Sequence, residues 1–261
     1  MNGLSFIHLE LTSRCNKNCS MCGRRKLEQA RSELCHWGDM EYDLVRFIAY
    51  QTPRNIVVQM HNNGEPLLYP LLGPVLNQFR NNIRCFNTNG KLLLERADDI
   101  IGNMETLTVS VIQDDPEGDE QYGVVTEFLR KRNTQKPHLI YRLLGNVHNK
   151  QRWLELPGVV ATRILHAPEA SRDYSKPTTV PEIGICLDLL THMAIDRFGN
   201  ISMCVRLDPE GHLRIGHVND GLRTAWNSKK RRTYIEYHIN QKRSELPGCR
   251  DCHFWGVPRG E

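Results

Sequence analysis

The sequence predicts an α/β fold, in which residues 1–166 form a partial (β/α)6 barrel and residues 186–261 form a small α+β module. Two observations lead to this prediction. Strand-like and helix-like segments alternate through the first part of the chain, and most of the cysteines fall into two patterned groups, one near each end. Alternation of this kind indicates a parallel sheet covered by helices. Right-handed crossovers allow such a sheet to curl into a partial barrel.

Six strands are expected in the barrel, beginning with a run whose apolar residues alternate with polar ones. These strands are residues 5–11, 55–61, 83–87, 106–112, 138–144 and 160–166. The helices expected between them are residues 41–51, 71–80, 91–101, 119–132 and 151–156. Residues 167–185 are rich in Pro, Ser and Thr, which indicates a connector. In the module we expect strands at 193–196 and 201–205, joined by a turn, and a helix at 222–239.

Polar groups follow the carboxyl ends of the first three strands. They are a cysteine-containing loop, then Gly64 and Glu65, then Thr88 and Asn89. Chemistry in parallel barrels is found at this end of the strands, so the three groups are expected to converge on one rim. Strand parity also predicts that His8 and Glu10 face the lumen.

Composition narrows the classes of partner. The 261 residues carry a formal charge of only +4, and we expect neither nucleic acid nor membrane as a partner. The basic run at 229–232 is interpreted as a solvated helix face. No signal-peptide pattern opens the chain, so a cytoplasmic location is expected, where nine cysteines favour metal or redox chemistry over disulfides.

The first cysteine group, Cys15, Cys19 and Cys22, has the spacing C-x3-C-x2-C. Three thiolates cover three irons of a 4Fe-4S cluster and leave the fourth iron open to a small molecule. A bacterial ferredoxin run would supply a fourth thiolate. A structural zinc site, the main alternative, usually has paired cysteines and four ligands.

These residues resemble the cluster motif of the radical S-adenosylmethionine (SAM) enzymes, and the resemblance implies a TIM-like partial barrel. In that family SAM chelates the open iron through its methionine amine and carboxylate. Gly64 and Glu65 resemble the family's Gly-Gly-Glu motif that holds the amine, although Asn63 stands where the first glycine is often found. Thr88 and Asn89, after the third strand, resemble the region that contacts the ribose in that family. Ser110 and Arg142 occupy places suited to further SAM contacts.

The second group is formed by Cys186, Cys204, Cys249 and Cys252, with Gly199 between the first two. It resembles the twitch module, a shortened form of the SPASM domain, which implies one auxiliary 4Fe-4S cluster with four protein thiolates. A zinc ribbon with four cysteine ligands remains the alternative. The two-part layout is similar to that of the aminoglycoside-pathway dehydrogenases of the radical SAM family.

The resemblance implies reductive cleavage of SAM to a 5′-deoxyadenosyl radical, which abstracts a hydrogen atom from a small polar substrate. The auxiliary cluster would accept the remaining electron, and a flavodoxin- or ferredoxin-type protein would supply the reducing electron. The alternatives are radical modification of a peptide or protein side chain, redox-neutral epimerisation, and a non-enzymatic iron-sulfur scaffold. His61 is the candidate general base, and Arg142 is a candidate clamp for a carboxylate. Cys85 would favour epimerisation if it faced the lumen, whereas no role is assigned to Cys35.

Overall fold

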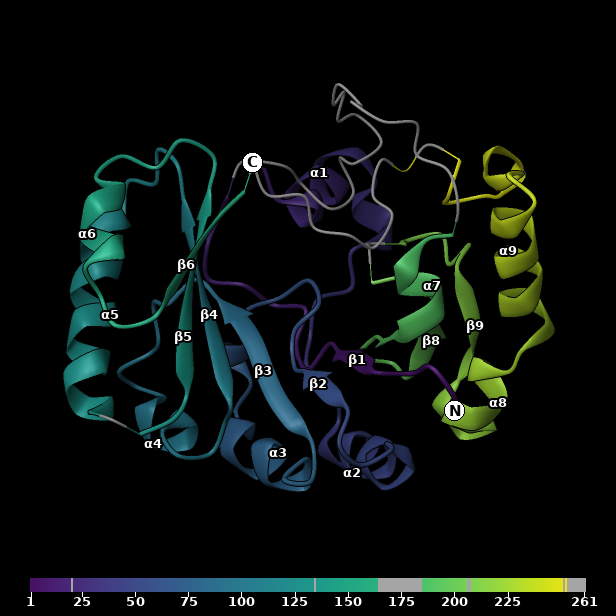
Figure 1. Ribbon diagram of the computed structural model, residues 1–261, viewed down its shortest axis with the longest axis horizontal. Coiled ribbons are helices and arrows are strands. Elements are labelled where there is room, and N and C mark those ends of the chain that lie inside the picture. The colour runs from purple at the N-terminus through teal and green to yellow at the C-terminus, as the bar shows by residue number, and fades with distance from the viewer. Residues whose placement is uncertain (20, 134, 164–184, 206–207, 251, 253–261) are drawn as a thin grey trace.

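The computed structural model describes residues 1–19, 21–133, 135–163, 185–205, 208–250 and 252. Its centre is a nine-stranded sheet in the order β6-β5-β4-β3-β2-β1-β7-β8-β9 (Figure 1). The first six strands in the chain are all parallel, and each pairs with the next. They are β1 Phe6–Leu9, β2 Val57–Gln59, β3 Ile83–Thr88, β4 Thr106–Ile112, β5 His138–Leu144 and β6 Val159–Arg163. The prediction of six parallel repeats is confirmed.

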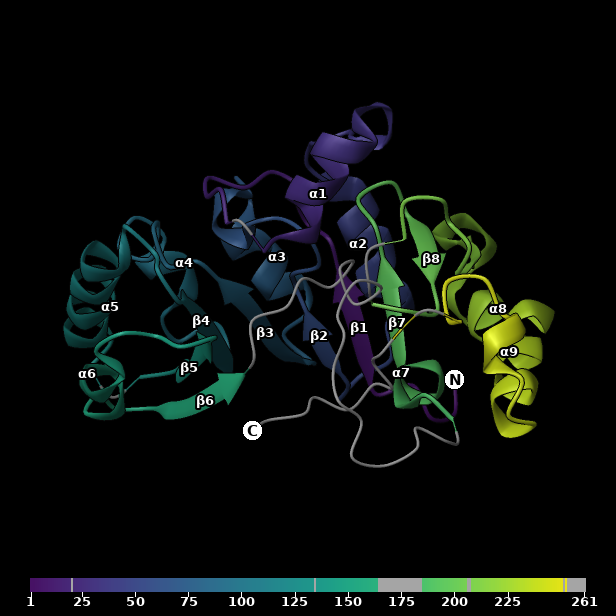
Figure 2. The ribbon, with the colours of Figure 1, turned by 90° about the horizontal axis from the view of Figure 1, so that it is seen from above.

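Helices cover the outer face of these strands, and Figure 2 shows the strands lying side by side inside them. The covering helices are α2 Tyr42–Gln51, α3 Leu72–Gln78, α4 Ala97–Ile100, α5 Gly118–Arg132 and α6 Lys150–Leu154. The core lies between the two layers. Ile7 and Leu9 of β1 are fully buried there, whereas His8 between them faces the opposite side and lines a cavity. The alternation predicted for this strand therefore separates an apolar helix-facing side from a polar interior side.

The C-terminal module continues the same sheet. Its strands are β7 His192–Ile195, β8 Asn200–Ser202 and β9 Arg214–His217. β7 pairs in parallel with β1, and β8 and β9 follow as antiparallel neighbours. The module's helices are α7 Leu187–Thr191, α8 Leu222–Trp226 and α9 Lys229–Ile239. The indole of Trp226 donates to the Asn2 carbonyl at 3.1 Å, so the module is also tied to the start of the chain.

Two helix predictions were too long. Within residues 91–101 only α4, Ala97–Ile100, is α-helical. Asn89 Oδ1 accepts the Lys91 N–H at 3.0 Å, and the Arg96 guanidinium donates to the Tyr69 carbonyl at 2.7 Å, so competing hydrogen bonds hold the preceding turns. The expected helix at 222–239 is broken before Lys229, because Ser228 caps α9 through the Arg231 N–H at 3.3 Å.

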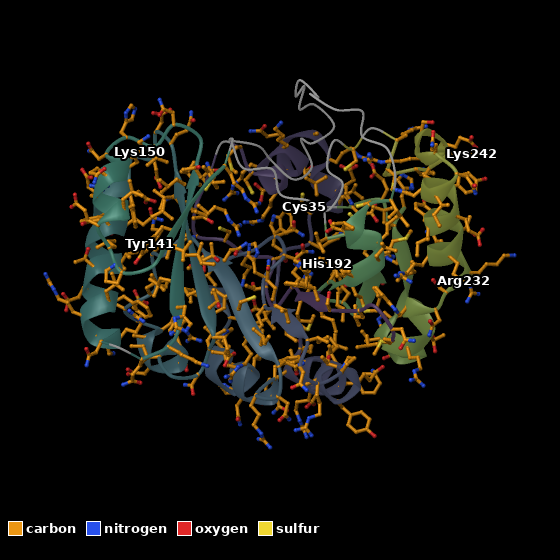
Figure 3. The ribbon with its side chains drawn as sticks, in the orientation of Figure 1. Cys35, Tyr141, Lys150, His192, Arg232 and Lys242 are labelled. Atoms are coloured by element: carbon orange, nitrogen blue, oxygen red, sulfur yellow. The ribbon has the colours of Figure 1, made fainter. Side chains whose placement is uncertain are left out.

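The basic run at 229–232 is solvated only in part. Arg232 lies on the exposed outside of α9 (Figure 3). Arg231 is buried, with its guanidinium 3.5 Å from the centroid of the Trp226 ring and bonded to the Leu189 and Trp226 carbonyls. It is therefore part of the packing, not of a charged face.

Among the α-helices and strands of the described residues, the sequence analysis did not predict α1 Gly23–Ala30, α7 and β9. Residues 167–184 of the expected connector, and the last residues of the sixth predicted strand, lie outside the described residues. In the described part of the chain, no helix has the length and apolar character needed to cross a membrane.

Candidate active site

The three N-terminal cysteines meet at one cavity. Cys15, Cys19 and Cys22 follow β1 and line a cavity of about 400 Å³. The Cys22 N–H donates to the Cys19 carbonyl at 3.1 Å, which folds the loop back toward the cavity. Burial raises the pKa of Cys15 and raises that of Cys19 to about 11. Because iron binds thiolates, an iron-sulfur cluster at these thiols would release protons on loading.

A buried ion pair holds the cysteine loop in place. The Lys17 ammonium bonds the Asp115 carboxylate, with side chains only 8% and 4% exposed, and lies 3.5 Å from Glu117. Arg25 donates to the Lys17 carbonyl at 2.8 Å. Because Asp115 and Glu117 belong to the loop between β4 and α5, this pair joins the cysteine loop to the far side of the barrel rim.

Gly64 occupies a position that no other residue fits. A Cβ atom there would lie 2.1 Å from the Thr12 carbonyl oxygen and 2.8 Å from that of Arg14. The next residue, Glu65, donates its N–H to the Arg14 carbonyl at 2.8 Å. The loop after β2 therefore packs backbone to backbone against the start of the cysteine loop, which requires glycine.

The Glu65 side chain is buried and accepts three protein hydrogen bonds. The donors are Thr88 Oγ1 at 2.7 Å, the Asn89 N–H at 2.8 Å and the Leu67 N–H at 3.1 Å. Burial raises the pKa of this carboxyl to about 7, against the opposing effect of the three donors. The carboxylate lines the cysteine cavity and can accept a further donor there.

Asn89 connects this carboxylate to the cysteines. Its Nδ2 donates to Asn16 Oδ1 at 2.8 Å and lies 4.0 Å from Cys15 Sγ. Gln121 of α5 donates both to the Asn89 carbonyl at 2.7 Å and to the Ser110 carbonyl at 2.9 Å. The ends of β3 and β4 are thus fixed relative to the cysteine loop.

Ser110 and Arg142 are paired across β4 and β5, and both line the same cavity with His61. Burial and the neighbouring Arg163 lower the pKa of Arg142 to about 10. Burial and the Arg142 charge lower the pKa of His61 to about 4. His61 is therefore neutral near pH 7, but it is a weaker base than an ordinary histidine.

The structure adds a histidine that the sequence analysis did not single out. His192 lines the cavity on the β1–β7 side, where its ring stacks on Phe6 at 4.6 Å and lies 5.3 Å from the His8 ring (Figure 3). Asp188 Oδ1 is 3.7 Å from His192 Nδ1. The sequence signal for this pair was an Asp and a His four residues apart, just after Cys186.

The tautomer of His192 follows from its neighbour Thr191. The single hydroxyl proton of Thr191 is donated to the Leu187 carbonyl at 2.7 Å. Thr191 Oγ1 must then accept from His192 Nδ1, which is 2.7 Å away. In this arrangement the neutral imidazole carries its proton on Nδ1.

The four C-terminal cysteines converge on a second, smaller cavity. Cys186, Cys204, Cys249 and Cys252 all line it, although they come from three separate segments. Burial raises the pKa of Cys186 to about 11 and that of Cys249 to about 12. Among the described residues, no three His, Cys, Asp or Glu side chains form a group that could hold a single metal ion. The thiols of the N-terminal group lie along the wall of one cavity, and those of the C-terminal group lie along the wall of the other.

Every residue predicted for the two sites lines one of these two cavities, while the individual roles stay predictions. Of the residues that the structure describes, Asp188 lines both cavities. The cysteine cavity thus extends from the N-terminal thiols to the wall of the auxiliary group.

Comparison with known proteins gives a family for the second group. Residues 186–253 match the SPASM family, an iron-sulfur cluster-binding domain. A curated protein of Pyrococcus furiosus, a tungsten-containing aldehyde ferredoxin oxidoreductase cofactor-modifying protein, is 28% identical over 114 residues. That match covers 42% of this chain but only 30% of the relative, less than a third of its length.

Solved structures share the fold over nearly the whole chain. BtrN, a 2-deoxy-scyllo-inosamine dehydrogenase, in complex with AdoMet and 2-DOIA matches with a TM-score of 0.59 and 16% identity, covering 99% of this chain and 96% of that chain. AdoMet-bound anSMEcpe matches with a TM-score of 0.66 and 12% identity over 95% and 88% of the two chains. Streptococcus suis SuiB bound to precursor peptide SuiA matches with a TM-score of 0.59 and 12% identity over 89% and 66%.

The predicted fold class, a TIM-like barrel with a SPASM-type module, is confirmed by these matches. The SPASM match supports an iron-sulfur cluster at the second cysteine group. The seven cysteines fit such clusters, because they form one set of three and one set of four around separate cavities.

Proposed function

We propose that the chain is a radical SAM oxidoreductase that dehydrogenates a C–H bond of a small polar substrate and uses its auxiliary cluster as electron acceptor. The observation that carries the proposal is Asp188, which lines both the cysteine cavity and the auxiliary cavity. A substrate in the first cavity would lie between the source of the radical and an electron acceptor.

The bound cofactors supply a 5′-deoxyadenosyl radical from SAM and one-electron oxidation at the auxiliary cluster. The residues of this chain bind and orient them. Cys15, Cys19 and Cys22 hold the first cluster and leave one iron for SAM. Glu65 would accept from the methionine amine, and Ser110 and Arg142, which line the cavity from β4 and β5, would bind its carboxylate.

The protein also provides a place for the proton. Conversion of a secondary alcohol to a ketone removes one hydrogen atom from carbon, one proton from oxygen and one electron. The nucleoside would take up the hydrogen atom, and the auxiliary cluster would supply the acceptor for the electron. We assign the proton to His192, because it lines the cavity and its Nδ1 lies 2.7 Å from Thr191 Oγ1 and 3.7 Å from Asp188 Oδ1. His61, with a pKa of about 4, is the weaker candidate.

Epimerisation is the second candidate function, and Cys85 is the observation that favours it. Cys85 lies on the same face of β3 as Asn87, which lines the cavity. Burial raises the pKa of its thiol to about 12, so the thiol keeps the hydrogen that an epimerase would return to the substrate radical. Incorporation of solvent deuterium into an otherwise unoxidised product, lost in Cys85→Ala, would identify this outcome.

Anaerobically purified protein tests the proposal directly. We expect about eight irons per chain and formation of 5′-deoxyadenosine from SAM under dithionite. Deuterated 2-deoxy-scyllo-inosamine and deuterated polyols are suitable first probes, because deuterium should appear in the nucleoside. Stoichiometric zinc at the second group, or no SAM cleavage, would exclude the proposal.

A further inference from the structure

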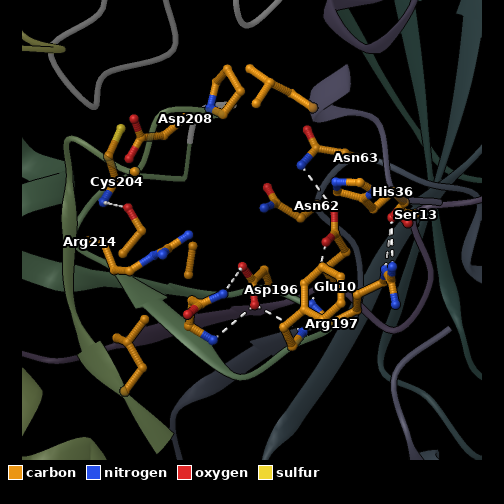
Figure 4. A pocket seen from close by; sticks show the side chains of 18 of the residues that line it. Glu10, Ser13, His36, Asn62, Asn63, Asp196, Arg197, Cys204, Asp208 and Arg214 are labelled. Atoms are coloured by element: carbon orange, nitrogen blue, oxygen red, sulfur yellow. Dashed lines mark hydrogen bonds between the residues drawn. The ribbon is translucent and has the colours of Figure 1, made fainter. Parts of the chain in front are cut away.

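Glu10 joins three parts of the molecule. It follows β1, its side chain is buried, and its N–H donates to the Ile195 carbonyl at 2.9 Å. One carboxylate oxygen accepts from Asn63 Nδ2 at 3.0 Å, and the other accepts from the Arg197 N–H at 3.4 Å (Figure 4). Asn63 belongs to the loop of Gly64 and Glu65, whereas Arg197 is in the turn between β7 and β8.

The turn that contains Arg197 is rigidly built. The Asp196 carboxylate accepts from the Phe198 N–H at 3.0 Å, the Asn200 N–H at 2.8 Å and Asn200 Nδ2 at 2.7 Å. The Arg197 guanidinium donates twice to the His36 carbonyl, at 2.7 and 3.0 Å, and stacks on the Phe198 ring at 3.8 Å. The turn therefore also holds the segment that follows α1.

The other partner of Glu10 lies beside the SAM-binding residues. Asn62 and Asn63 line both the cysteine cavity and a neighbouring cavity of about 250 Å³ around Glu10 (Figure 4). Cys204, a candidate ligand of the auxiliary cluster, also lines this cavity around Glu10. A movement of the β7–β8 turn would thus reach the Glu65 loop through one carboxylate.

We propose that Glu10 is a positioning residue that couples the β7–β8 turn of the auxiliary module to the loop of Asn63, Gly64 and Glu65, and so sets the affinity for SAM. The inference rests on the proposed function in one respect, namely that Glu65 binds SAM. It makes the auxiliary module a structural support of the SAM site in addition to an electron acceptor.

The test is a double-mutant analysis of SAM binding with the full-length, cluster-loaded protein. Glu10→Ala, Asn63→Ala and Asp196→Ala are made singly, and Glu10→Ala is combined with each of the other two. SAM affinity is read from the change in the electron paramagnetic resonance signal of the reduced first cluster on titration with SAM. The KM for SAM in substrate-free cleavage is a second reading, and iron content checks that both clusters are loaded.

Each single substitution is expected to weaken SAM affinity about tenfold, within the usual range of coupling between sites. Both double variants should bind SAM no more weakly than Glu10→Ala does, because the three residues act through one connection. Glu127→Ala, an exposed change on α5, is the matched control and should bind SAM as the unmodified protein does. Glu10→Gln keeps one acceptor oxygen, so its SAM affinity should lie between that of Glu10→Ala and that of the unmodified protein. An intermediate affinity separates the effect on SAM binding from a loss of folding.

An unchanged SAM affinity in Glu10→Ala, or losses that multiply in the double variants, would overturn the coupling. If the unmodified protein binds SAM but yields no oxidised product, the coupling can still be measured, and only the proposed dehydrogenation fails. If it binds no SAM, both fail together.

Discussion

Thr88 Oγ1 donates a hydrogen bond of 2.7 Å to Glu65 Oε1, and this buried contact ties the loop after β2 to the end of β3. The Asn89 N–H bonds the other carboxylate oxygen at 2.8 Å. Both oxygens of Glu65 are thus oriented by β3 before any ligand is bound. The pKa of the carboxyl is nevertheless raised to about 7, so burial outweighs these donors.

This pKa predicts that SAM binding depends on pH. A carboxylate accepts from the SAM amine better than a carboxylic acid does, so affinity should rise with pH up to about 7 and then level off. One linked proton gives at most about a tenfold change per pH unit. Calorimetric titrations of the anaerobic protein with SAM from pH 6 to 8 measure this change in affinity. In Glu65→Gln the affinity should be low and this pH dependence absent, whereas Glu127→Gln should behave as the unmodified protein.

The Glu65 carboxyl should make folding stability fall with rising pH, whereas SAM affinity should rise with it. Because the folded-state pKa of Glu65 exceeds its ordinary value of 4.5, the folded protein holds the proton more tightly than the unfolded chain. Its stabilising effect is full below pH 4.5 and is lost as the pH rises through about 7. Thermal unfolding of Glu65→Gln should therefore show a gain over the unmodified protein that grows toward pH 8. A gain that grew toward acid pH would contradict the pKa shift.

Gly64→Ala should disrupt the site through packing alone. The new Cβ would lie 2.1 Å from a backbone oxygen that cannot move without shifting the cysteine loop. We expect a loss of about 3 kcal/mol in the free energy of unfolding, with poor loading of the first cluster. Gly123→Ala is the matched control, because a Cβ there meets nothing within 4 Å on α5. It should stabilise by up to about 1 kcal/mol.

Asp115→Ala should weaken the hold on the cysteine loop. It leaves the Lys17 ammonium buried without its main partner, which costs about 3 kcal/mol. Denaturant unfolding and the iron content of the first site measure the effect. Replacing both partners, as in Lys17→Met with Asp115→Leu, should recover much of the stability, because no buried charge is then left unpaired. Equal losses in the single and double variants would show that the ion pair is not what holds the loop.

Loss of the auxiliary thiols should separate SAM cleavage from oxidation. Cys249→Ala with Cys252→Ala is expected to reduce iron from about eight to about four per chain, with substrate oxidation lost and SAM cleavage retained. Iron analysis, nucleoside quantification and product analysis are made on one sample. Full oxidation by this variant would mean that the second cluster is not the electron acceptor.

His192→Asn should lower product formation about 100-fold, the smaller end of the range for loss of a general base. Hydrogen abstraction does not need the base, so deuterium transfer into 5′-deoxyadenosine should fall far less than the yield of oxidised product. Thr191→Val removes the acceptor that fixes the Nδ1 proton and should give an intermediate loss. A parallel fall of both products would assign His192 to substrate binding.

The sequence predicted the features that depend on local pattern. Apolar alternation located β1, and Gly and Pro at the segment ends marked most of the barrel strands and helices. The rim followed from the rule that parallel strands place their carboxyl ends together, which is why Glu65 and Asn89 were expected near the cysteines before their hydrogen bonds were known.

Features set by distant contacts were not predictable in the same way. The break before Lys229 depends on Ser228 as a cap and on the burial of Arg231 against Trp226. The role considered for His192 depends on β7 lying beside β1, a pairing between segments far apart in sequence. The weak basicity of His61 depends on its burial and on the charge of Arg142, which lines the same cavity from β5, and no local pattern reveals either.

The parallel pairing of β7 with β1 has a consequence for any attempt to divide the protein. A fragment ending before residue 186 would leave the backbone amides and carbonyls of Phe6–Leu9 open along the flank of the barrel. Such exposed strand flanks recruit other chains and promote aggregation. The auxiliary module therefore also shields the barrel from self-association, and a truncated enzyme would be expected to precipitate before its chemistry could be assayed.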